Sequence, residues 1–493
     1  MWMPEHFDAE QPLYRAIAAR LREDVGAGRL SPGDRLPTVR HLADALGINV
    51  GTVYRAYTLA EQQGIVSKEP GRGTFVRDIR RDSGPARSGN PEGGAILQGE
   101  EDSDHDPTGP VDMTRNEPPF VPLDGMLRQS LIEISRNSPL DGMLEYGHSQ
   151  GLARHREILA EWLIRTQGLE FDATNLAESL IVTGGAQQGL TIALGALANP
   201  GDTILVEELS YPGVRNLARF FGLLLRPVAM DDQGIVPEAL DRACTESGAR
   251  VLYCMPHAHN PTTATMDEPR RLAVATIAER HGLMVIEDDV NPHSISDVTV
   301  QNPAEKVEIW RPLATVLPDR TLYISGLSKI IAPGLRVGMI AAPAGVFSDV
   351  LAASQTTSWM APPLMAELAC LWIRNGMARD LMEHRATITA DLQAVARRVL
   401  AELPYRAHPA NTHLWLPLPT SWSAREFVDA ASGRGVMLSP STQFAIDPSN
   451  VQPGVRLCLS DEGGRVAHER LERALATITE LYFEPPRPQA FRM

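Results

Sequence analysis

The sequence predicts a multidomain protein in which a small winged helix-turn-helix domain precedes a large α/β domain. Three observations predict this fold class. Residues 11–77 contain three helix patterns followed by two β-prone segments, the next stretch is poor in core-forming residues, and from about residue 179 apolar strands alternate with helix patterns. The length of 493 residues also exceeds one compact domain. We therefore expect three regions: residues 1–77, 78–110 and 111–493.

The first region has the element order of a winged helix-turn-helix. Apolar residues recur every fourth position at Leu13, Ile17, Leu21 and Val25. A second helix pattern stops at Gly47, and Asn49 is a suitable N-cap for a third, which ends at Gly64. Two β-prone segments around Pro70-Gly71-Arg72-Gly73 then predict a hairpin. The short turn between the second and third helices is typical of proteins that place a recognition helix in a major groove.

Charge and composition separate this region from the rest of the chain. Residues 11–77 contain ten basic and six acidic residues, whereas the whole chain has a net charge of −15, so we expect only this region to meet a polyanion. In residues 78–110, thirteen of 33 residues are Gly, Pro or Ser and eight are acidic. Such a segment cannot bury a core and predicts a flexible linker with a root-mean-square span of roughly 30 Å.

The third region predicts an α/β fold with a largely parallel sheet. Apolar strand patterns alternate with helix patterns from residue 179 to about residue 343. We expect a large lobe over about residues 150–345 and a smaller lobe over about residues 346–493. The sequence contains no apolar run long enough to span a membrane and no secretion signal near its N-terminus, so we expect a cytoplasmic location. Four scattered cysteines indicate neither a disulfide framework nor a zinc site, and we expect no metal.

Polar residues follow the expected strands, at the sheet edge where open α/β folds bind ligands. They are the glycine turn before Ala186 and Gln187, Tyr211, Asn260, the pair Asp288 and Asp289, and Lys329 followed by Arg336. Each has an ordinary structural alternative, since glycines form tight turns, Asn-Pro forms turns and aspartates cap helices. Lys329 is the most informative, because only three of the 46 basic residues are lysines. A lysine amine can condense with an aldehyde, whereas an arginine guanidinium cannot; the alternative is an incidental surface charge.

Together these residue types suit pyridoxal phosphate. That cofactor needs a lysine for its aldehyde, a carboxylate for its ring nitrogen, an anion cradle and an aromatic residue against the ring. Glycines at a strand-to-helix turn allow backbone N–H groups to face a phosphate. The combination of these residues therefore indicates a pyridoxal phosphate site more specifically than any single residue does.

Two regions of the chain resemble known protein families. Residues 111–493 resemble a fold-type I aminotransferase of the class I/II group, with SKIIAPGLRVG as the most specific motif. Residues 11–77 resemble a GntR-type DNA-binding domain, through GDRLPTVRHLADALGINVGTVYRAY. The order of the regions resembles the MocR family of bacterial transcription regulators. The resemblance implies a homodimer, pyridoxal phosphate as cofactor, and a double-stranded DNA operator.

The resemblance also implies residue roles. Lys329 would bind the cofactor aldehyde, Asp288 the pyridine nitrogen and Asn260 the phenolic oxygen, while Tyr211 would stack on the ring. The phosphate would be held by Ala186, Gln187, Ser328 and Arg336, with Tyr146 reaching it from the other subunit. Arg456 would bind an effector carboxylate, because a guanidinium can pair with a carboxylate through two hydrogen bonds. DNA would be contacted by Thr38, Arg40, Thr52, Tyr54, Arg55, Arg72 and Gly73, although Arg40 and Arg55 could equally be solvated helix charges.

Three positions depart from the family pattern. Val290 and Asn291 stand where the family often has a tyrosine near the phenolic oxygen, and Gly326 stands where serine is common. Both changes remove polar contacts to the cofactor. Val50 replaces a polar residue of related recognition helices, so base readout is expected to differ.

The function predicted from these features is a DNA-binding transcription regulator that senses an amino acid, an amine or pyridoxal phosphate itself. The alternative from another class is a working aminotransferase with an appended DNA-binding domain. A third possibility, a carboxylate sensor without the cofactor, does not explain Lys329 and Asp288 together.

Overall fold

The computed structural model describes residues 2–3, 13–26, 29–31, 33–62, 66–69, 73–76, 109–291, 293, 310–459 and 465–484. The chain divides into two compact units, Met1–Glu100 and Glu101–Met493, and each is described by itself. Most of the expected linker lies outside the described residues. Among the helices of the described part, none combines the length and apolar character needed to cross a membrane.

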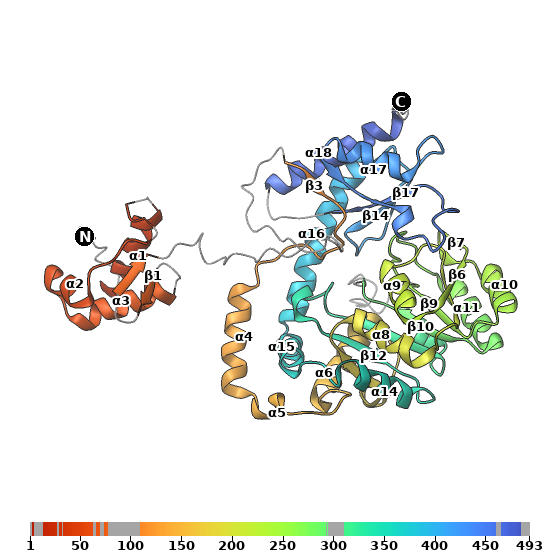
Figure 1. The fold of residues 1–493 in the computed structure, drawn as a ribbon, viewed down its shortest axis with the longest axis horizontal. Coiled ribbons are helices and arrows are strands. Elements are labelled where there is room, and N and C mark those ends of the chain that lie inside the picture. Colours follow the sequence, from red (N-terminus) through yellow and green to blue (C-terminus); the bar gives the residue numbers. More distant parts are fainter. Residues whose placement is uncertain are drawn as a thin grey trace, which may run out of the picture. The chain divides into compact units, whose positions relative to one another are not determined.

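The first unit is a winged helix-turn-helix, as predicted (Figure 1). Its elements are α1 (Leu13–Gly26), α2 (Val39–Leu46), α3 (Val50–Gln62), β1 (Val66–Glu69) and β2 (Gly73–Val76). Gly47 ends α2 in the left-handed conformation with φ 64°, a conformation that glycine adopts without steric cost. The Asn49 Oδ1 atom accepts a 2.7 Å hydrogen bond from the Gly51 N–H at the start of α3. Buried Leu21, Leu42 and Tyr57 belong to one core shared by all five elements, so the unit has its own hydrophobic core.

The second unit is built around a seven-stranded sheet (Figure 1). Its strands are, in spatial order, β4 (Leu180–Thr183), β12 (Gly338–Ala341), β11 (Thr321–Gly326), β10 (Met284–Asp288), β9 (Val251–Cys254), β5 (Thr203–Glu207) and β6 (Leu224–Val228). β12 pairs antiparallel with both neighbours, and all other pairs are parallel. This confirms the predicted largely parallel sheet. The edge strand β6 was not predicted, because its Pro227 and exposed Leu224 do not give a strand pattern.

Helices cover both faces of the sheet, as its parallel strands require. α8 (Ala186–Leu197), α9 (Pro212–Phe221) and α14 (Phe347–Ser358) share a core with one face. The cores of the other face contain α6 (Ala153–Gln167), α7 (Ala173–Ser179), α10 (Pro237–Ser247), α11 (Glu268–His281), α13 (Leu313–Val316) and α15 (Pro363–Arg374). The remaining elements are α4 (Asp124–Asn137), α5 (Asp141–Leu144), the hairpin β7 (Met230–Asp231) and β8 (Gly234–Ile235), and the 3₁₀ turn η1 (Pro333–Leu335).

The small lobe has a four-stranded sheet. Its order is β13 (Arg406–Ala407), β14 (His413–Pro417), β17 (Gly454–Cys458) and β16 (Ser439–Pro440). It packs with α16 (Met377–Val399), α17 (Ala424–Ser432) and α18 (Arg465–Phe483), and η2 (Ser441–Gln443) follows β16. β15 (Val436–Met437) pairs with β3 (Val111–Asp112), which brings the start of the body into this lobe.

The change from the large to the small core lies within α16, later than the expected boundary near residue 346. Ala378 and Leu381 near the start of α16 belong to the large-lobe core, whereas Leu392 and Ala396 belong to the small-lobe core. A 23-residue helix is roughly 35 Å long, enough to serve both lobes. α14 and α15 pack with the large lobe, a placement that their helix patterns alone could not reveal.

Candidate functional site

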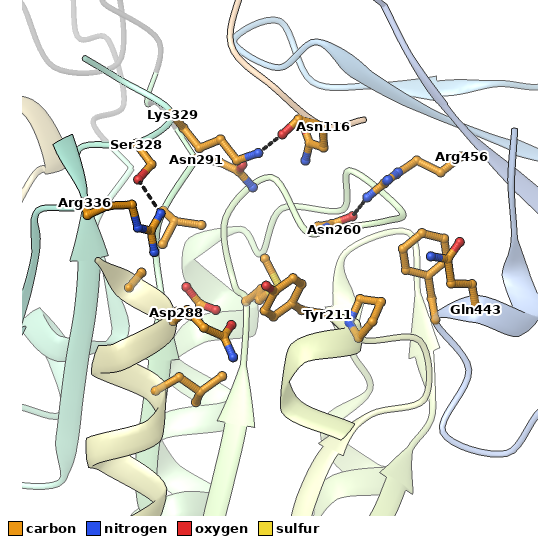
Figure 2. Close-up of a pocket in the computed structure, with 18 residues that line it drawn as sticks. Asn116, Tyr211, Asn260, Asp288, Asn291, Ser328, Lys329, Arg336, Gln443 and Arg456 are labelled. Atoms are coloured by element: carbon orange, nitrogen blue, oxygen red, sulfur yellow. Dashed lines mark hydrogen bonds between the residues drawn. The ribbon is translucent and has the colours of Figure 1, made fainter. Parts of the chain in front are cut away.

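A cavity of about 420 Å³ opens at the carboxyl ends of the central strands (Figure 2). Nine of the ten cofactor and effector residues predicted from the sequence line it: Ala186, Gln187, Tyr211, Asn260, Asp288, Ser328, Lys329, Arg336 and Arg456. They come from two strands, from the first turn of α8 and from the loops that follow the strands. The fold therefore brings together residues that are up to 270 positions apart in the sequence, from residue 186 to residue 456.

Asp288 ends β10 and turns one carboxylate oxygen toward the cavity. Its Oδ2 atom accepts a 2.7 Å hydrogen bond from the Tyr253 hydroxyl, whereas Oδ1 is buried without a partner among the described residues. Burial raises the pKa of Asp288 to about 7, and the neighbouring charge of Asp289 adds to this effect. An unpaired buried acceptor fits a protonated ring nitrogen. Asp289 does not line the cavity and instead accepts a hydrogen bond from the Tyr323 hydroxyl.

Replacing Asp288 with asparagine should weaken binding of pyridoxal phosphate by about 1.5–3 kcal/mol, the usual value of a charge-assisted hydrogen bond. The substitution keeps the size of the side chain and removes the charge that would pair with the ring nitrogen. Titration of the cofactor-free protein, followed by absorption, measures the affinity. If Asp289→Asn caused the larger loss, the carboxylate facing the cofactor would be Asp289.

The start of α8 has the geometry expected of an anion-binding site. Gly185, with φ 97°, precedes the helix, and a Cβ atom there would lie 2.7 Å from Arg336 Nη2. A Cβ atom on Gly338 would lie 2.5 Å from the backbone of Gly185. The first N–H groups of a helix lack intrahelical partners and attract anions. Arg336 Nη1 lies 3.4 Å from Ser328 Oγ, which places a guanidinium and a hydroxyl beside those groups (Figure 2).

Lys329 follows β11, and its amine donates a hydrogen bond to the backbone oxygen of Asn116 (Figure 2). Burial lowers the pKa of Lys329 to about 8. The positive charge of Arg456 lowers this pKa further, whereas the nearby Cys458 side chain acts in the opposite direction and raises it. A lowered pKa makes the neutral, nucleophilic amine available near physiological pH.

The rate at which pyridoxal phosphate attaches to the cofactor-free protein should therefore rise through pH 8 and level off near pH 9. With a pKa of about 8, the neutral fraction of the amine rises roughly tenfold between pH 7 and pH 9. An ordinary lysine would gain roughly a hundredfold over the same range and continue to rise. Stopped-flow absorption, with Nα-acetyllysine as the reference amine, measures the difference. A profile parallel to that of Nα-acetyllysine would contradict the lowered pKa.

Tyr211 and Asn260 enter the cavity from two loops. Tyr211 precedes α9, and a Cβ atom on Gly213 would lie 2.1 Å from the Tyr211 ring, so that glycine leaves the space the ring occupies. Asn260 Oδ1 accepts a 2.9 Å hydrogen bond from Arg456 Nη1. At the position where the family often has tyrosine, Asn291 donates from Nδ2 to the backbone oxygen of Ala258 over 2.8 Å. Asn291 thus holds the loop that carries Asn260.

Arg456, on β17, is a buried cation without a carboxylate within ion-pair distance in the described part of the chain. It is 7% exposed, it also donates to the backbone oxygen of Thr114, and its guanidinium lies 4.9 Å from the centre of the Phe444 ring. A buried charge without an ionic partner is costly unless a ligand supplies one. The arrangement suits a carboxylate ligand.

The remaining predicted residues lie elsewhere. Tyr146 is 89% exposed and outside the cavity, with its ring 6.3 Å from that of Trp359. In the first unit, Thr38 caps α2 by accepting from the His41 N–H. Arg40, Tyr54 and Arg55 are exposed, Thr52 is half-buried and Gly73 begins β2, whereas Arg72 lies outside the described residues.

Sequence reasoning did not name four polar or aromatic residues of the site or its support: Tyr253, Asn116, Gln443 and Phe444. Tyr253 could have been found, because it stands on β9 opposite Ile286, two residues before Asp288 on the neighbouring strand β10. The others reach the cavity from loops or from the small lobe, and no periodic pattern predicts such contacts.

Comparison with known proteins agrees with this geometry. Residues 13–76 match the family described as bacterial regulatory proteins, gntR family, and residues 111–471 match aminotransferase class I and II. The HTH-type transcriptional regulator YdeF of Bacillus subtilis is 30% identical over 480 residues, which cover 97% of this chain and 96% of YdeF. The probable rhizopine catabolism regulatory protein MocR of Rhizobium meliloti is 26% identical over 457 residues, covering 90% of this chain and 89% of MocR.

A solved structure shows the same fold. The kynurenine aminotransferase of Pyrococcus horikoshii superposes with a TM-score of 0.66 at 21% identity, over 77% of this chain and 92% of that enzyme. The chain therefore belongs to the MocR family of transcriptional regulators, in which a GntR-type DNA-binding domain precedes an aminotransferase class I and II domain.

Proposed function

We propose that the protein is a pyridoxal phosphate-dependent, DNA-binding transcription regulator whose aminotransferase-like domain senses a small amino acid, an amine or the cofactor itself. The observation that carries this proposal is the cavity in which Lys329, Asp288 and the start of α8 converge. When bound, pyridoxal phosphate would supply an aldehyde that reacts with amines and a ring that withdraws electrons.

The residues present fit that cofactor at three points. The unpaired Oδ1 atom of Asp288 offers an acceptor for the ring nitrogen. The α8 start, Ser328 and Arg336 offer donors to a phosphate, and Lys329 offers an amine of lowered pKa. Arg456 would orient an effector by its carboxylate, with Asn260 held beside it.

The first unit would bind an operator through α3. In helix-turn-helix proteins the second helix of the motif enters the major groove, and here α3 exposes Tyr54 and Arg55. Arg40 on α2 is also exposed and is proposed to contact phosphates. Arg72 and Gly73 are proposed to contact DNA from the wing.

The test compares full-length protein with the fragment 1–77, titrated with operator DNA in the presence and absence of candidate amino acids. Full-length protein should bind with a strongly salt-dependent affinity, and an effector should change that affinity by about 1–3 kcal/mol. The fragment has its own core and should bind weakly without responding. A response by the fragment alone would contradict the sensing role of the body.

A working aminotransferase is the second candidate, and the lowered pKa of Lys329 favours it, because a neutral amine can also accept a proton from a substrate. Turnover separates the two candidates. Incubation with an amino acid and a 2-oxo acid, followed by product analysis, should show at most slow transfer if the protein is a dedicated regulator.

We also propose a homodimer, in which Tyr146 completes the partner's site. Tyr146 belongs to a group of exposed apolar side chains on the second unit that includes Leu144, 84% exposed, and Trp359, 51% exposed. Sedimentation should give a dimer, and Leu144→Glu should weaken it and lower cofactor affinity. Phe220→Glu, at another exposed apolar site, is the control that should do neither. A wild-type monomer with full cofactor occupancy would contradict this arrangement.

A further inference from the structure

A buried cluster of His257, Asp289 and His293 lies beside the cavity and has no part in the proposed function. His257 is in the loop after β9, Asp289 directly follows β10, and His293 comes four residues later. Their exposed fractions are 2%, 1% and 3%. Two imidazoles and one carboxylate are a common ligand combination for transition metals, above all zinc.

The distances in the cluster are close to those of a metal site. His293 Nε2 lies 2.9 Å from Asp289 Oδ2, and His257 Nδ1 lies 3.7 Å from Asp289 Oδ1. One ligand atom from each residue lies within 4.8 Å of the other two. Zinc bonds of about 2.0–2.2 Å in tetrahedral geometry separate ligand atoms by about 3.4 Å, so side-chain shifts on the order of 1 Å would complete the site.

A plain hydrogen-bond network accounts for only part of the cluster. It explains His293, which contacts both carboxylate oxygens of Asp289. It does not explain His257, because neither of its ring nitrogens has a hydrogen-bond partner among the described residues. The distance of 3.7 Å between His257 Nδ1 and Asp289 Oδ1 is too long for a hydrogen bond. Leaving a polar group buried and unpaired is unfavourable. A metal ion bound at Nδ1 would remove that penalty for one nitrogen.

The surroundings also suit a metal ion. The centre of the Trp310 ring lies 4.7 Å from that of His257 and 5.1 Å from that of His293, and the His408 ring lies 4.8 Å from that of His257, so aromatic rings pack against the cluster. A second cavity of about 270 Å³ is lined by His293, Lys329 and Asn411, so it extends to the edge of the cluster.

We propose that His257, Asp289 and His293 bind one divalent transition-metal ion, with zinc as the best chemical match and a water molecule as the fourth ligand. Binding replaces the hydrogen bond between His293 and Asp289, with the proton of the neutral imidazole on the ring nitrogen that does not face the ion. His257 is three residues before Asn260, and Asp289 directly follows Asp288. The ion would therefore tie together the two segments that present Asn260 and Asp288 to the cofactor.

The test measures zinc binding to the full-length protein that carries its cofactor. After treatment with a chelator and removal of that chelator, the protein is dialysed against a range of ZnCl₂ concentrations, and bound zinc is measured by mass spectrometry. We expect one zinc per chain, with affinity at least about tenfold lower in His257→Ala and in His293→Ala. His384→Ala, which removes an exposed histidine of α16, should bind like the wild type and controls for surface sites. All variants carry the same cofactor, so chelation by the cofactor cannot produce the difference.

Thermal unfolding gives an independent measurement. Zinc should raise the unfolding temperature of the wild type and of His384→Ala, but not that of His257→Ala, because only an intact site links binding to folding. The proposal is overturned if the wild type shows no saturable binding at one equivalent. It is also overturned if folded His257→Ala binds with unchanged affinity. The wild-type measurement alone decides the case in which a variant does not fold.

Discussion

Replacing Lys329 with alanine should abolish covalent attachment of pyridoxal phosphate. The amine of Lys329 is the lysine nitrogen that lines the cavity among the described residues, and burial has already lowered its pKa to about 8. Borohydride reduction followed by intact mass measurement detects the adduct as a fixed mass increase. We expect a stoichiometric adduct in the wild type and none in the variant.

The small number of lysines makes the control simple. Lys68 and Lys306 are the only other lysines of the sequence, and Lys68→Ala and Lys306→Ala should retain the full adduct. Lys329→Arg should lose the adduct as Lys329→Ala does, although it keeps the positive charge, because a guanidinium stays protonated and does not condense with aldehydes. An undiminished adduct in Lys329→Ala would place the cofactor on another residue.

Replacing Arg456 with alanine should reduce affinity for amino-acid effectors by about 2–5 kcal/mol, roughly thirtyfold or more, because it removes the buried cation that would pair with their carboxylate. The readout is the change in absorption of the bound cofactor when L-amino acids are added. Wild-type protein should distinguish an amino acid from the amine that lacks its carboxylate.

Two variants sharpen this experiment. Arg456→Lys keeps the charge but loses the forked geometry, and should retain an intermediate response. Arg425→Ala removes an 89% exposed arginine of α17 and should respond like the wild type. If Arg456→Ala still preferred the amino acid over the matching amine, the carboxylate would bind elsewhere.

Most cofactor residues could be predicted because a parallel sheet aligns the carboxyl ends of its strands. Asp288 and Lys329 were recognisable from their place at or close to the ends of apolar strands. The choice between Asp288 and Asp289 follows from the alternation of side chains along β10, which turns Asp288 to the cavity and Asp289 away from it. The first unit was predictable for another reason, since Gly47 and Asn49 mark a helix end and a helix start.

Other features depend on contacts that no local pattern contains. Asn291 was expected only as the loss of a tyrosine, yet its amide donates to the backbone of Ala258, a partner that becomes a neighbour only in the fold. Cysteine spacing predicted no zinc site, and the proposed ligands escape such patterns because His257 lies 32 residues before Asp289. The change between the two cores within α16 had no signal in the sequence either, because a helix pattern does not reveal which core its apolar face joins.

The pairing of β3 with β15 gives the start of the body a fixed path. Pro110 and Gly109 accept hydrogen bonds from Arg470 and Arg473 of α18, and β3 follows directly. This is the end of the body to which the expected linker connects.

The loop that follows β3 contacts two residues of the cavity, Arg456 and Lys329. Thr114 accepts a hydrogen bond from Arg456, and Asn116 accepts one from the Lys329 amine. A molecule that engages either side chain competes with the backbone of this segment. Pro110, which α18 holds, thus precedes the partners of Arg456 and Lys329 by only a few residues. If a ligand binds these two side chains as proposed, we expect it to act directly on the segment to which the expected linker connects.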